Sequence, residues 1–268
     1  WRPCAGVLGY DFISRFVVEI NFDRETIVLH DPKTFRYEGG GVAVPLQFAG
    51  NIPVVECTID DRYQGLFRLD VGSGSTVDLH TPFVKAHGLR GQVATRVEVT
   101  GGGFGGTFTS EVTRMKRMSV GPYAWDDPIV VLSNATEGGL ASEDYAGNIG
   151  NHLMERFRLT FDYERKQVWL EPSARVASRD RFSMIGVQLT RIGDVVTAMQ
   201  VLPGSAGAAA GIRAGDLVVA IDGRAIGRLT LDALNAMFED GRPGERHRVT
   251  VVRDGRKKTV KVVLKELV

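Results

Sequence analysis

Apolar and polar residues alternate in short runs through most of the chain before Pro172, with glycine, proline and aspartate between the runs. Such alternation is typical of half-buried β-strands, and turn residues at this spacing predict an all-β domain. One helix is expected after Thr81, because Pro82 suits the first helical position and Gly88 follows the end. The expected strands are 42–48, 52–59, 65–69, 93–99, 107–118 and 128–132.

One segment of the chain occurs twice. The sequence GVLGYDFISRF at 6–16 recurs as GNIGNHLMERF at 147–157, an offset of 141 (147 − 6), and the similarity continues without a gap to Leu29 and Leu170. Each copy shows an apolar-glycine turn, a short helical stretch and two alternating strands, with hairpin turns at 23–25 and 164–166. We expect both copies to have the same backbone course, with Phe16 and Phe157 buried equally. The duplication indicates a two-lobed β-protein.

The offset also predicts how the chain is divided. The body that precedes the second copy begins near Gly41, and the same offset places the body of the first copy before residue 1. We therefore expect the tail of one lobe at 1–40 and a complete lobe at 41–173. A short polar segment at 173–180 is expected to be a linker, and a second domain follows at 181–268.

The segment LFRLDVGSGSTV at 66–77 is an apolar strand that stops at a carboxylate and turns at glycine. Gly72 permits a close backbone approach, and Ser73 is expected to donate a hydrogen bond to the carboxylate of Asp70. With the later motif NIG at 148–150, this loop resembles the retropepsin and pepsin family of aspartic proteases, over about residues 4–172. The resemblance implies a retropepsin-like β-barrel lobe with Asp70 as a catalytic residue, supported by Gly72, Ser73, Ile149 and Gly150.

The resemblance also implies a mechanism and its requirements. The family mechanism uses two carboxylates that share one proton, and it needs no cofactor. Peptides or proteins would be the substrates of such an endopeptidase. The partner of Asp70 would lie in the missing lobe, or in a second copy of the chain if it forms a homodimer. Val71 stands where the family has a hydroxyl that braces the opposing loop, so the alternative is a catalytically inactive, protease-like scaffold that binds peptides.

The glycine-rich segment at 101–106 matches the pattern G-x-G-x-x-G of dinucleotide-binding proteins. Strand-type alternation follows it, however, whereas phosphate binding needs the N-terminus of a helix at that point. The resemblance instead places here the flap hairpin that covers the substrate, with Gly102, Gly103 and Phe104 in it. A flexible hairpin without a function is the other interpretation.

The last part of the chain has a different pattern. Ser205 is expected to cap a small-residue helix that ends at Gly211, and Thr230 to cap a second helix at 231–239. Strands are expected at 217–221, 247–253 and 258–264, with Asp-Gly turns at 222–223 and 254–255. The segment 182–268 resembles bacterial PDZ domains, which are β-sandwiches with two helices.

The PDZ resemblance implies a site for a peptide C-terminus. Such a peptide is added as a strand, and a backbone loop holds its carboxylate. The loop would be formed by Ile185, Gly186 and Val187. Leu189, Leu231, Leu234 and Asn235 are predicted to line the groove for the peptide. Core packing is the other interpretation of the apolar residues among them, above all of Leu234.

Composition narrows the classes of function. Lys and Arg number 33 and Asp and Glu 32, so the net charge of +1 favours neither nucleic acid nor anionic lipid as a partner. Cys4, Cys57 and the five histidines lack the spacing of a metal site, and none is predicted. Two small buried hydrophobic residues are the favoured interpretation of the cysteines, with a disulfide left open. From the family resemblance alone we expect an extracytoplasmic location.

Overall fold

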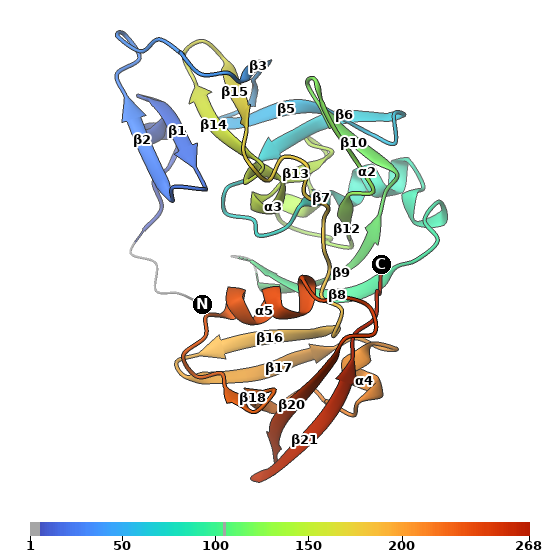
Figure 1. Cartoon of the computed structure of the whole chain (residues 1–268). Helices are drawn as coiled ribbons and strands as arrows, with labels where there is room; N and C mark the ends of the chain where they lie inside the picture. Colours follow the sequence, from blue (N-terminus) through green and yellow to red (C-terminus); the bar gives the residue numbers. More distant parts are fainter. Residues whose placement is uncertain (1–5, 104–105) are drawn as a thin grey trace. The chain divides into compact units, whose positions relative to one another are not determined.

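The computed structural model describes residues 6–103 and 106–268, and side chains outside 102–107 (Figure 1). The chain divides into two compact units, each described by itself below. Of the described residues, the larger unit comprises 6–94, 103 and 106–180, and the smaller one comprises 181–268 together with 95–102. The finer boundary predicted at residue 40 stays a prediction. Both units are mainly β-structure, which confirms the predicted fold class.

Five strands form the first sheet, in the order β2-β1-β14-β15-β3. A ten-stranded sheet has the order β11-β10-β5-β6-β13-β7-β12-β9-β8, with β4 paired to β5. The first sheet contains β1 (Val17–Asn21), β2 (Thr26–His30), β3 (Val42–Pro45), β14 (Phe157–Asp162) and β15 (Gln167–Pro172). The second contains β4 (Gln47–Ala49), β5 (Ile52–Ile59), β6 (Tyr63–Leu69), β7 (Val77–Leu79), β8 (Val97–Gly103), β9 (Gly106–Arg114), β10 (Arg117–Val120), β11 (Tyr123–Asp126), β12 (Ile129–Ser133) and β13 (Gly147–Ile149).

Short helical segments connect these strands. They are α1 (Tyr10–Ile13), α2 (Thr81–Ala86) and α3 (Asn151–Met154), with 3-10 turns at Leu89–Gly91 and Gly139–Ala141. The helix predicted after Thr81 is α2, and Gly88 beyond its end has a φ of 58°, a conformation that favours glycine. The strand predicted at 42–48 is divided between β3 and β4, because the first pairs with β15 and the second with β5. The strand predicted at 107–118 is divided between β9 and β10, and β7, β11 and β13 were not predicted.

The two copies of the repeated segment have the same elements. Helix α1 and helix α3 are related by the offset of 141 at both ends, and each is followed by an antiparallel hairpin, β1–β2 or β14–β15. The hairpin turns also correspond, because Glu25 and Lys166 both have a φ of 53°. The predicted duplication is therefore confirmed at the level of the backbone, and β1 and β14 pair with each other at the centre of the sheet.

The burial of the two copies differs, contrary to the expectation. Phe157 is buried and packs against the rings of Tyr123 and Trp125, whereas Phe16 is only partly buried. The reason is that the second copy is covered by the body of its own lobe, which the first copy lacks among the described residues. Apolar positions of the first copy are therefore exposed where their counterparts are in the core.

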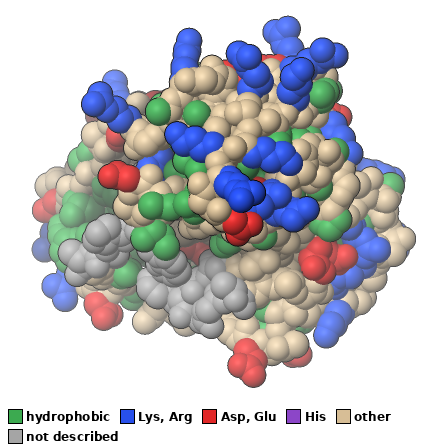
Figure 2. All heavy atoms as spheres, turned by 90° about the horizontal axis from the view of Figure 1, so that it is seen from below, with side chains coloured by type: hydrophobic (Ala, Val, Ile, Leu, Met, Phe, Trp, Pro, Cys, Tyr) green, Lys and Arg blue, Asp and Glu red, His purple; other side chains and the backbone are tan. Residues whose placement is uncertain are grey.

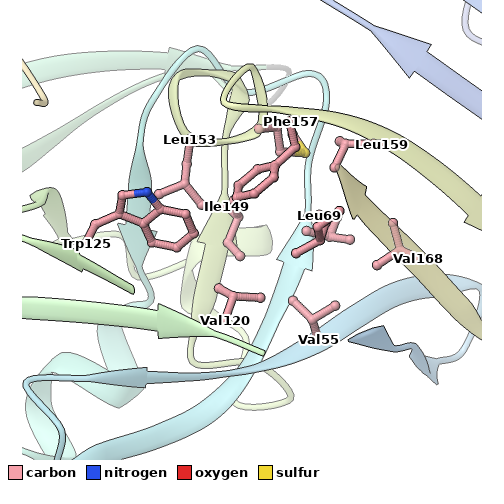
Figure 3. Close-up of a pocket in the computed structure, with 11 residues that line it drawn as sticks. Val55, Leu69, Val120, Trp125, Ile149, Leu153, Phe157, Leu159 and Val168 are labelled. Atoms are coloured by element: carbon pink, nitrogen blue, oxygen red, sulfur yellow. The ribbon is translucent and has the colours of Figure 1, made fainter. Parts of the chain in front are cut away.

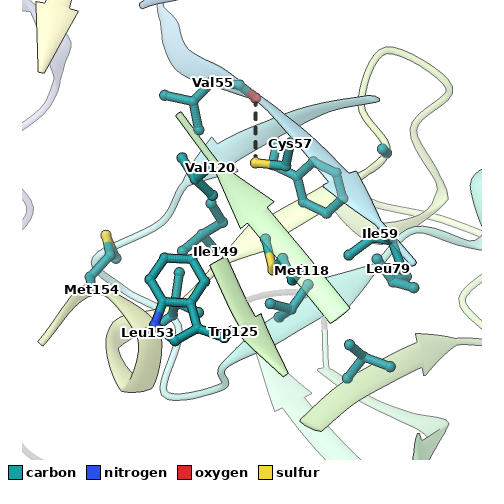
Figure 4. Close-up of a cluster of buried hydrophobic side chains, with 14 of the residues drawn as sticks. Val55, Cys57, Ile59, Leu79, Met118, Val120, Trp125, Ile149, Leu153 and Met154 are labelled. Carbon is teal, nitrogen blue, oxygen red and sulfur yellow. Dashed lines mark hydrogen bonds between the residues drawn. The ribbon is translucent and has the colours of Figure 1, made fainter. Parts of the chain in front are cut away.

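The core of the larger unit lies beneath β5, β10 and β13. Met118, Val120 and Trp125 point from β10 and β11 toward Ile149 and Leu153 (Figure 4). Cys57 belongs to this core with a free thiol, and burial raises its pKa well above the usual value. This confirms the interpretation of Cys57 as a small buried hydrophobic residue. Cys4 lies outside the described residues.

The segment 173–180 was predicted to be a linker, and the structure corrects this. The carboxylate of Asp180 is buried, pairs with Arg156 and accepts a hydrogen bond from the N–H of Ile129 at 2.9 Å. The indole N–H of Trp125 donates to the carbonyl oxygen of Val176 at 3.3 Å. The polar sequence therefore belongs to the larger unit up to Asp180.

Residues 181–268 of the smaller unit form one sheet of six strands with two helices. The strand order is β16-β17-β18-β20-β21, with β19 paired to β18. Ser205 and Thr230 cap the two helices as predicted, because their hydroxyls accept from the N–H groups of Ala208 and Ala233 at 3.1 Å. The elements are β16 (Val187–Ile192), β17 (Val195–Val201), α4 (Ala206–Ala209), β18 (Leu217–Ile221), β19 (Arg224–Ala225), α5 (Leu231–Glu239), β20 (Arg246–Arg253) and β21 (Arg256–Val263).

Several Lys and Arg residues at 253–261 lie in the β20–β21 hairpin, whose two strands and turn the sequence predicts. Figure 2 shows one face of the molecule, on which Lys and Arg side chains stand as separate projections with hydrophobic side chains between them. Among the helices of the described residues, none is long and apolar enough to cross a membrane.

A buried ion pair stabilises the smaller unit. Arg253 binds both carboxylate oxygens of Asp216, at 2.6 and 2.7 Å, and also the carbonyl oxygen of Gly211 at 2.8 Å. Because Asp216 is 1% exposed, Arg253→Ala would leave a buried charge without its cation. We expect the smaller unit to lose unfolding free energy at neutral pH relative to the wild type, measured by urea denaturation. The exposed Arg256→Ala is the control.

The same ion pair has a pH dependence. Hydrogen bonds from Arg253 lower the pKa of Asp216 in the folded state. The stabilisation is therefore complete above the usual aspartate range and is lost as the pH falls through the lowered pKa. The difference between the wild type and Arg253→Ala should shrink in strong acid, and a difference that grows there would contradict this account.

Candidate functional site

Asp70 lies directly after β6, at the point where this strand leaves the sheet. Its N–H donates to the carbonyl oxygen of Ile149 at 2.9 Å, so β13 holds the chain up to the carboxylate. Strand β13 is parallel to β6 and antiparallel to β7, and it lies between them. The sheet thus brings Asp70 beside Gly150, which is 80 residues away in the sequence (150 − 70).

The loop after Asp70 is held by backbone hydrogen bonds. The N–H of Gly72 donates to Oδ1 of Asp70 at 3.0 Å, and the N–H of Ser73 donates to the carbonyl oxygen of Asp70 at 3.1 Å. Gly150 permits the closest approach, because a Cβ atom there would lie 2.3 Å from the carbonyl oxygen of Ser75. The structure therefore brings together the predicted loop residues and the predicted residues Ile149 and Gly150.

The role predicted for the Ser73 hydroxyl is wrong. It was expected to donate to the Asp70 carboxylate, but it donates to Oδ2 of Asp78 at 3.1 Å and lies 2.8 Å from the hydroxyl of Ser75. The reason is the direction of the glycine turn, which brings both hydroxyls to β7. The oxygen of Asp70 that receives a hydrogen bond is bound by Gly72 instead.

Asn151, the first residue of α3, binds the loop after Asp70, and the sequence pattern does not predict this contact. Its side-chain Nδ2 donates to the carbonyl oxygen of Val71 at 2.9 Å, and its N–H donates to that of Ser73 at 2.8 Å. The other side-chain atom, Oδ1, is buried without a hydrogen-bond partner among the described residues. The only signal in the sequence is its position directly after Gly150, and in the first copy this position is Tyr10.

An apolar cavity of about 10 Å³ lies beneath the loop. Leu69 and Ile149, which precede Asp70 and Gly150, point into it together with Val55, Val120 and Phe157 (Figure 3). A cavity of this size is a packing defect of the core, because it is at the lower limit for one water molecule. The apolar side chains around the cavity anchor the strand ends that carry the site. The cavity is not itself a ligand site.

A polar network lies behind the site. The side-chain oxygen of Asn148 accepts from Nε of Arg68 at 2.7 Å and lies 2.9 Å from Nε2 of His80. His80 is fully buried, and burial lowers its pKa. The network fixes β13 between its neighbours, one residue before Ile149.

The predicted flap is only partly within the described residues. Strands β8 and β9 are neighbours in the sheet and form the two sides of a hairpin. Gly102 and Gly103 are the last residues of β8. Phe104 lies outside the described residues, so its predicted role stays a prediction.

The smaller unit has a groove of about 290 Å³ between the start of β16 and the end of α5. Strand β16 is the edge of its sheet, so its outer side is open for the addition of a peptide strand. Of the predicted residues, Gly186, Val187, Leu189 and Asn235 line the groove. Lining residues that were not predicted include Phe182, Gln188, Met199 and Leu202.

Two predicted groove residues lie elsewhere. Leu234 is 0% exposed and belongs to the core of the smaller unit, as the alternative interpretation of apolar residues has it. The side chain of Ile185 is also in this core, and the role predicted for its backbone stays a prediction. Leu231 is not among the lining residues of the groove. The helix α5 is amphipathic, so only residues on one edge of its inner face, such as Asn235, reach the groove.

In the loop predicted to hold a carboxylate, some backbone groups already form hydrogen bonds within the chain. The N–H of Gly186 donates to the carbonyl oxygen of Ser183 at 3.2 Å. The N–H of Leu202 donates to the carbonyl oxygen of Gly186 at 2.9 Å, so these two residues form a hydrogen-bonded pair. In an antiparallel ladder, hydrogen-bonded and non-hydrogen-bonded pairs alternate. The next pair, Val187 with Val201, is therefore non-bonded, and the N–H of Val187 points to the open edge.

Comparisons with known proteins identify one part of the chain. The family model of the PDZ domain matches residues 183–264. A search of curated proteins finds no match.

Three solved structures illustrate the remote structural similarities. The photosystem II D1 C-terminal processing protease is 24% identical over 32% of this chain and 24% of its own, with a TM-score of 0.30. A retropepsin-like aspartic protease from Rickettsia conorii is 13% identical over 49% and 89%, with a TM-score of 0.34. An HtrA-type protease with a decapeptide is 14% identical over 64% and 59%, with a TM-score of 0.33. Of this chain, residues 183–264 match the family of PDZ domains.

Proposed function

We propose that the chain carries one half of an aspartic endopeptidase, with Asp70 as one of two catalytic carboxylates, and that its PDZ domain binds peptides. The observation that carries the proposal is the course of the backbone around Asp70. The strand β6 ends at the carboxylate, and the following loop packs on Gly150 at a distance that no side chain allows. Cleavage of peptides by the protein and by its Asp70→Asn variant tests the proposal.

The chemistry requires a second carboxylate within hydrogen-bond distance of Asp70. One carboxylate takes a proton from the attacking water while the other, protonated, donates to the substrate, and no covalent intermediate forms. The N–H of Gly72 holds Oδ1 of Asp70. The loop residue that binds Asp70 therefore orients the carboxylate that reacts.

Apolar residues of the first copy of the repeated segment are exposed, and we propose that a partner lobe docks on them. Exposed fractions are 69% for Leu8, 69% for Ile27 and 40% for Leu29. Their counterparts at the offset of 141 are 0% for Ile149, 0% for Val168 and 4% for Leu170.

Strand pairing differs between the copies in the same way. The outer edge of β15 is paired with β3, whereas β2, its counterpart, is the last strand of the sheet. We propose that a lobe of the same fold as residues 41–146, located upstream in the same polypeptide, covers these residues and supplies the second carboxylate. Docking of a second copy of this chain is the other arrangement that would cover them.

A second candidate function is a scaffold that binds peptides without cleaving them. The observation that favours it is that the peptide groove of the PDZ domain is formed within the smaller unit, whereas the described residues contain one half of the catalytic pair. Val71 also lacks the hydroxyl that braces the opposing loop in the family that this lobe resembles. Peptide binding without cleavage by the protein that includes both lobes would support this candidate.

The PDZ groove should distinguish free from amidated peptide C-termini, but weakly. Of the predicted loop, the N–H of Val187 points to the open edge, whereas that of Gly186 is already bonded. Replacing the carboxylate by an amide should therefore weaken binding by about 1.5 kcal/mol, the low end for a hydrogen bond to a charged group. Calorimetry on the whole chain with paired acid and amide peptides measures the difference. Equal affinity would mean that the groove binds internal segments.

A further inference from the structure

Asp78 is a carboxylate in the middle of a strand in the interior of the ten-stranded sheet. It is the central residue of β7 and lies opposite Asn148 of β13, which in turn lies opposite Arg68 of β6. Directly opposed residues of adjacent strands share one face, so Arg68, Asn148 and Asp78 form a polar row across three strands. The neighbouring row, Leu69 with Ile149 and Val77, leads into Asp70 and Gly150.

The Asp78 carboxylate is bound by the loop that carries Asp70. Its Oδ2 accepts from the hydroxyl of Ser75 at 2.7 Å and from that of Ser73 at 3.1 Å. The two hydroxyls are 2.8 Å apart, and the N–H of Ser75 donates to the hydroxyl oxygen of Ser73 at 3.3 Å. A partly buried carboxylate needs such bonds, because an unpaired one would be costly. Both of its known donors come from one loop.

We propose that Asp78 is a positioning residue that holds the Asp70 loop through the hydroxyls of Ser73 and Ser75. The inference rests on the proposed role of Asp70 as a catalytic residue. It assigns to Asp78 part of the support of the loop that carries Asp70. Nε of Arg68 donates to Oδ1 of Asn148, whereas the hydrogen bonds found for the Asp78 carboxylate among the described residues come from the loop.

The effect on Asp70 passes through Ser73. The hydroxyl of Ser73 is fixed by Asp78, and its N–H binds the carbonyl oxygen of Asp70 at 3.1 Å. Gly72, between them, donates to Oδ1 of Asp70 at 3.0 Å. Without Asp78, the two serine hydroxyls lose their common acceptor, and the loop becomes free to take other turns. The orientation of the Asp70 carboxylate would then be less well defined.

The ionisation of Asp78 gives this contact a pH dependence. Burial raises its pKa, the hydroxyls of Ser75 and Ser73 lower it, Asp70 raises it and Arg68 lowers it, and the net direction is upward. His80, the other titratable group on this face, binds Asn148. Because this pKa is raised above that of a solvated carboxylate, linkage requires that the packed loop lose stability as the pH rises through it. The loop should therefore be held less tightly above this pKa than below it.

Hydrogen exchange of the whole chain, followed by NMR, tests the proposal without any activity assay. Asp78→Leu should accelerate exchange of the Gly72 and Ser73 amides on the order of tenfold, as expected for the loss of about one hydrogen bond. Asp78→Asn keeps an acceptor oxygen and should restore most of the protection, but without the pH dependence. Ser119→Ala, in β10 of the same unit, is the matched control.

A double variant, Ser73→Ala with Ser75→Ala, keeps the test informative if Asp78→Leu does not fold. It should accelerate exchange of Gly72 to the same extent. Unchanged exchange in the loop, or equal acceleration throughout the larger unit, would overturn the proposal. In a protein with both lobes, Asp78→Leu should lower kcat more than it raises KM. Loss of loop protection in Asp78→Leu, together with absence of any cleavage by the wild-type two-lobed protein, would contradict the proposed function and leave the role of Asp78 intact.

Discussion

In a protein that includes the proposed partner lobe, the amides of residues 26–29 should exchange their hydrogens at least about 10²-fold more slowly than in the present chain. The strand β2 is now the last of its sheet, and Ile27 is 69% exposed. The free energy needed to open an edge strand is small, whereas opening a strand that is paired on both sides and covered by a core needs several kcal/mol. The amides of β20 and β21, in the smaller unit, provide the control within the same measurement.

Variants of β2 make the same prediction specific. Ile27→Glu with Leu29→Glu should prevent docking of the partner lobe, so exchange at 26–29 should remain fast and cleavage should be lost. Val263→Glu, at an apolar residue of β21 that is 48% exposed, is the matched control and should have no effect on either. Unchanged exchange of β2 in the two-lobed protein would mean that the partner lobe docks elsewhere. Protection that appears in the present chain at high concentration would mean that a second copy covers β2.

Features that depend on neighbours in the sequence could be predicted. The caps Ser205 and Thr230 were identified because a cap and its helix are adjacent in the chain. The Asp-Gly turns were identified for the same reason, and Asp222 and Asp254 both have the φ of 50° that such turns use. The repeated segment was found because its two copies keep a common register over both hairpins.

Features that depend on strand register could not be predicted. The hydroxyl of Ser73 points to Asp78 because β7 returns beside β13, and no pattern in the sequence specifies that direction. Asn151 reaches Val71 across 80 residues of sequence (151 − 71). The expectation that Phe16 and Phe157 are equally buried was wrong, because burial depends on the surrounding lobe as well as on the local sequence pattern. The same holds for Leu234, whose apolar character suited both the groove and the core.

The role of Asp70 makes a prediction about pH as well as about mutation. Two carboxylates that share one proton are active only while exactly one proton is bound between them. Peptide cleavage by the two-lobed protein should therefore be fastest in acid and fall toward neutral pH. The present chain should be inactive as a monomer at every pH, because one carboxylate cannot act as base and acid together.

The most direct test is a peptide-cleavage assay of the two-lobed protein at acidic pH, with Asp70→Asn compared against the wild type. Asparagine keeps the shape of the side chain and the bond from Gly72 but cannot take up a proton. We expect the rate to fall by about 10² to 10⁴-fold, the range for a lost acid or base. Asp61→Asn, at a 73% exposed side chain in the same unit, should leave the rate unchanged. Cleavage by Asp70→Asn at the wild-type rate would contradict the assignment of Asp70 as a catalytic carboxylate.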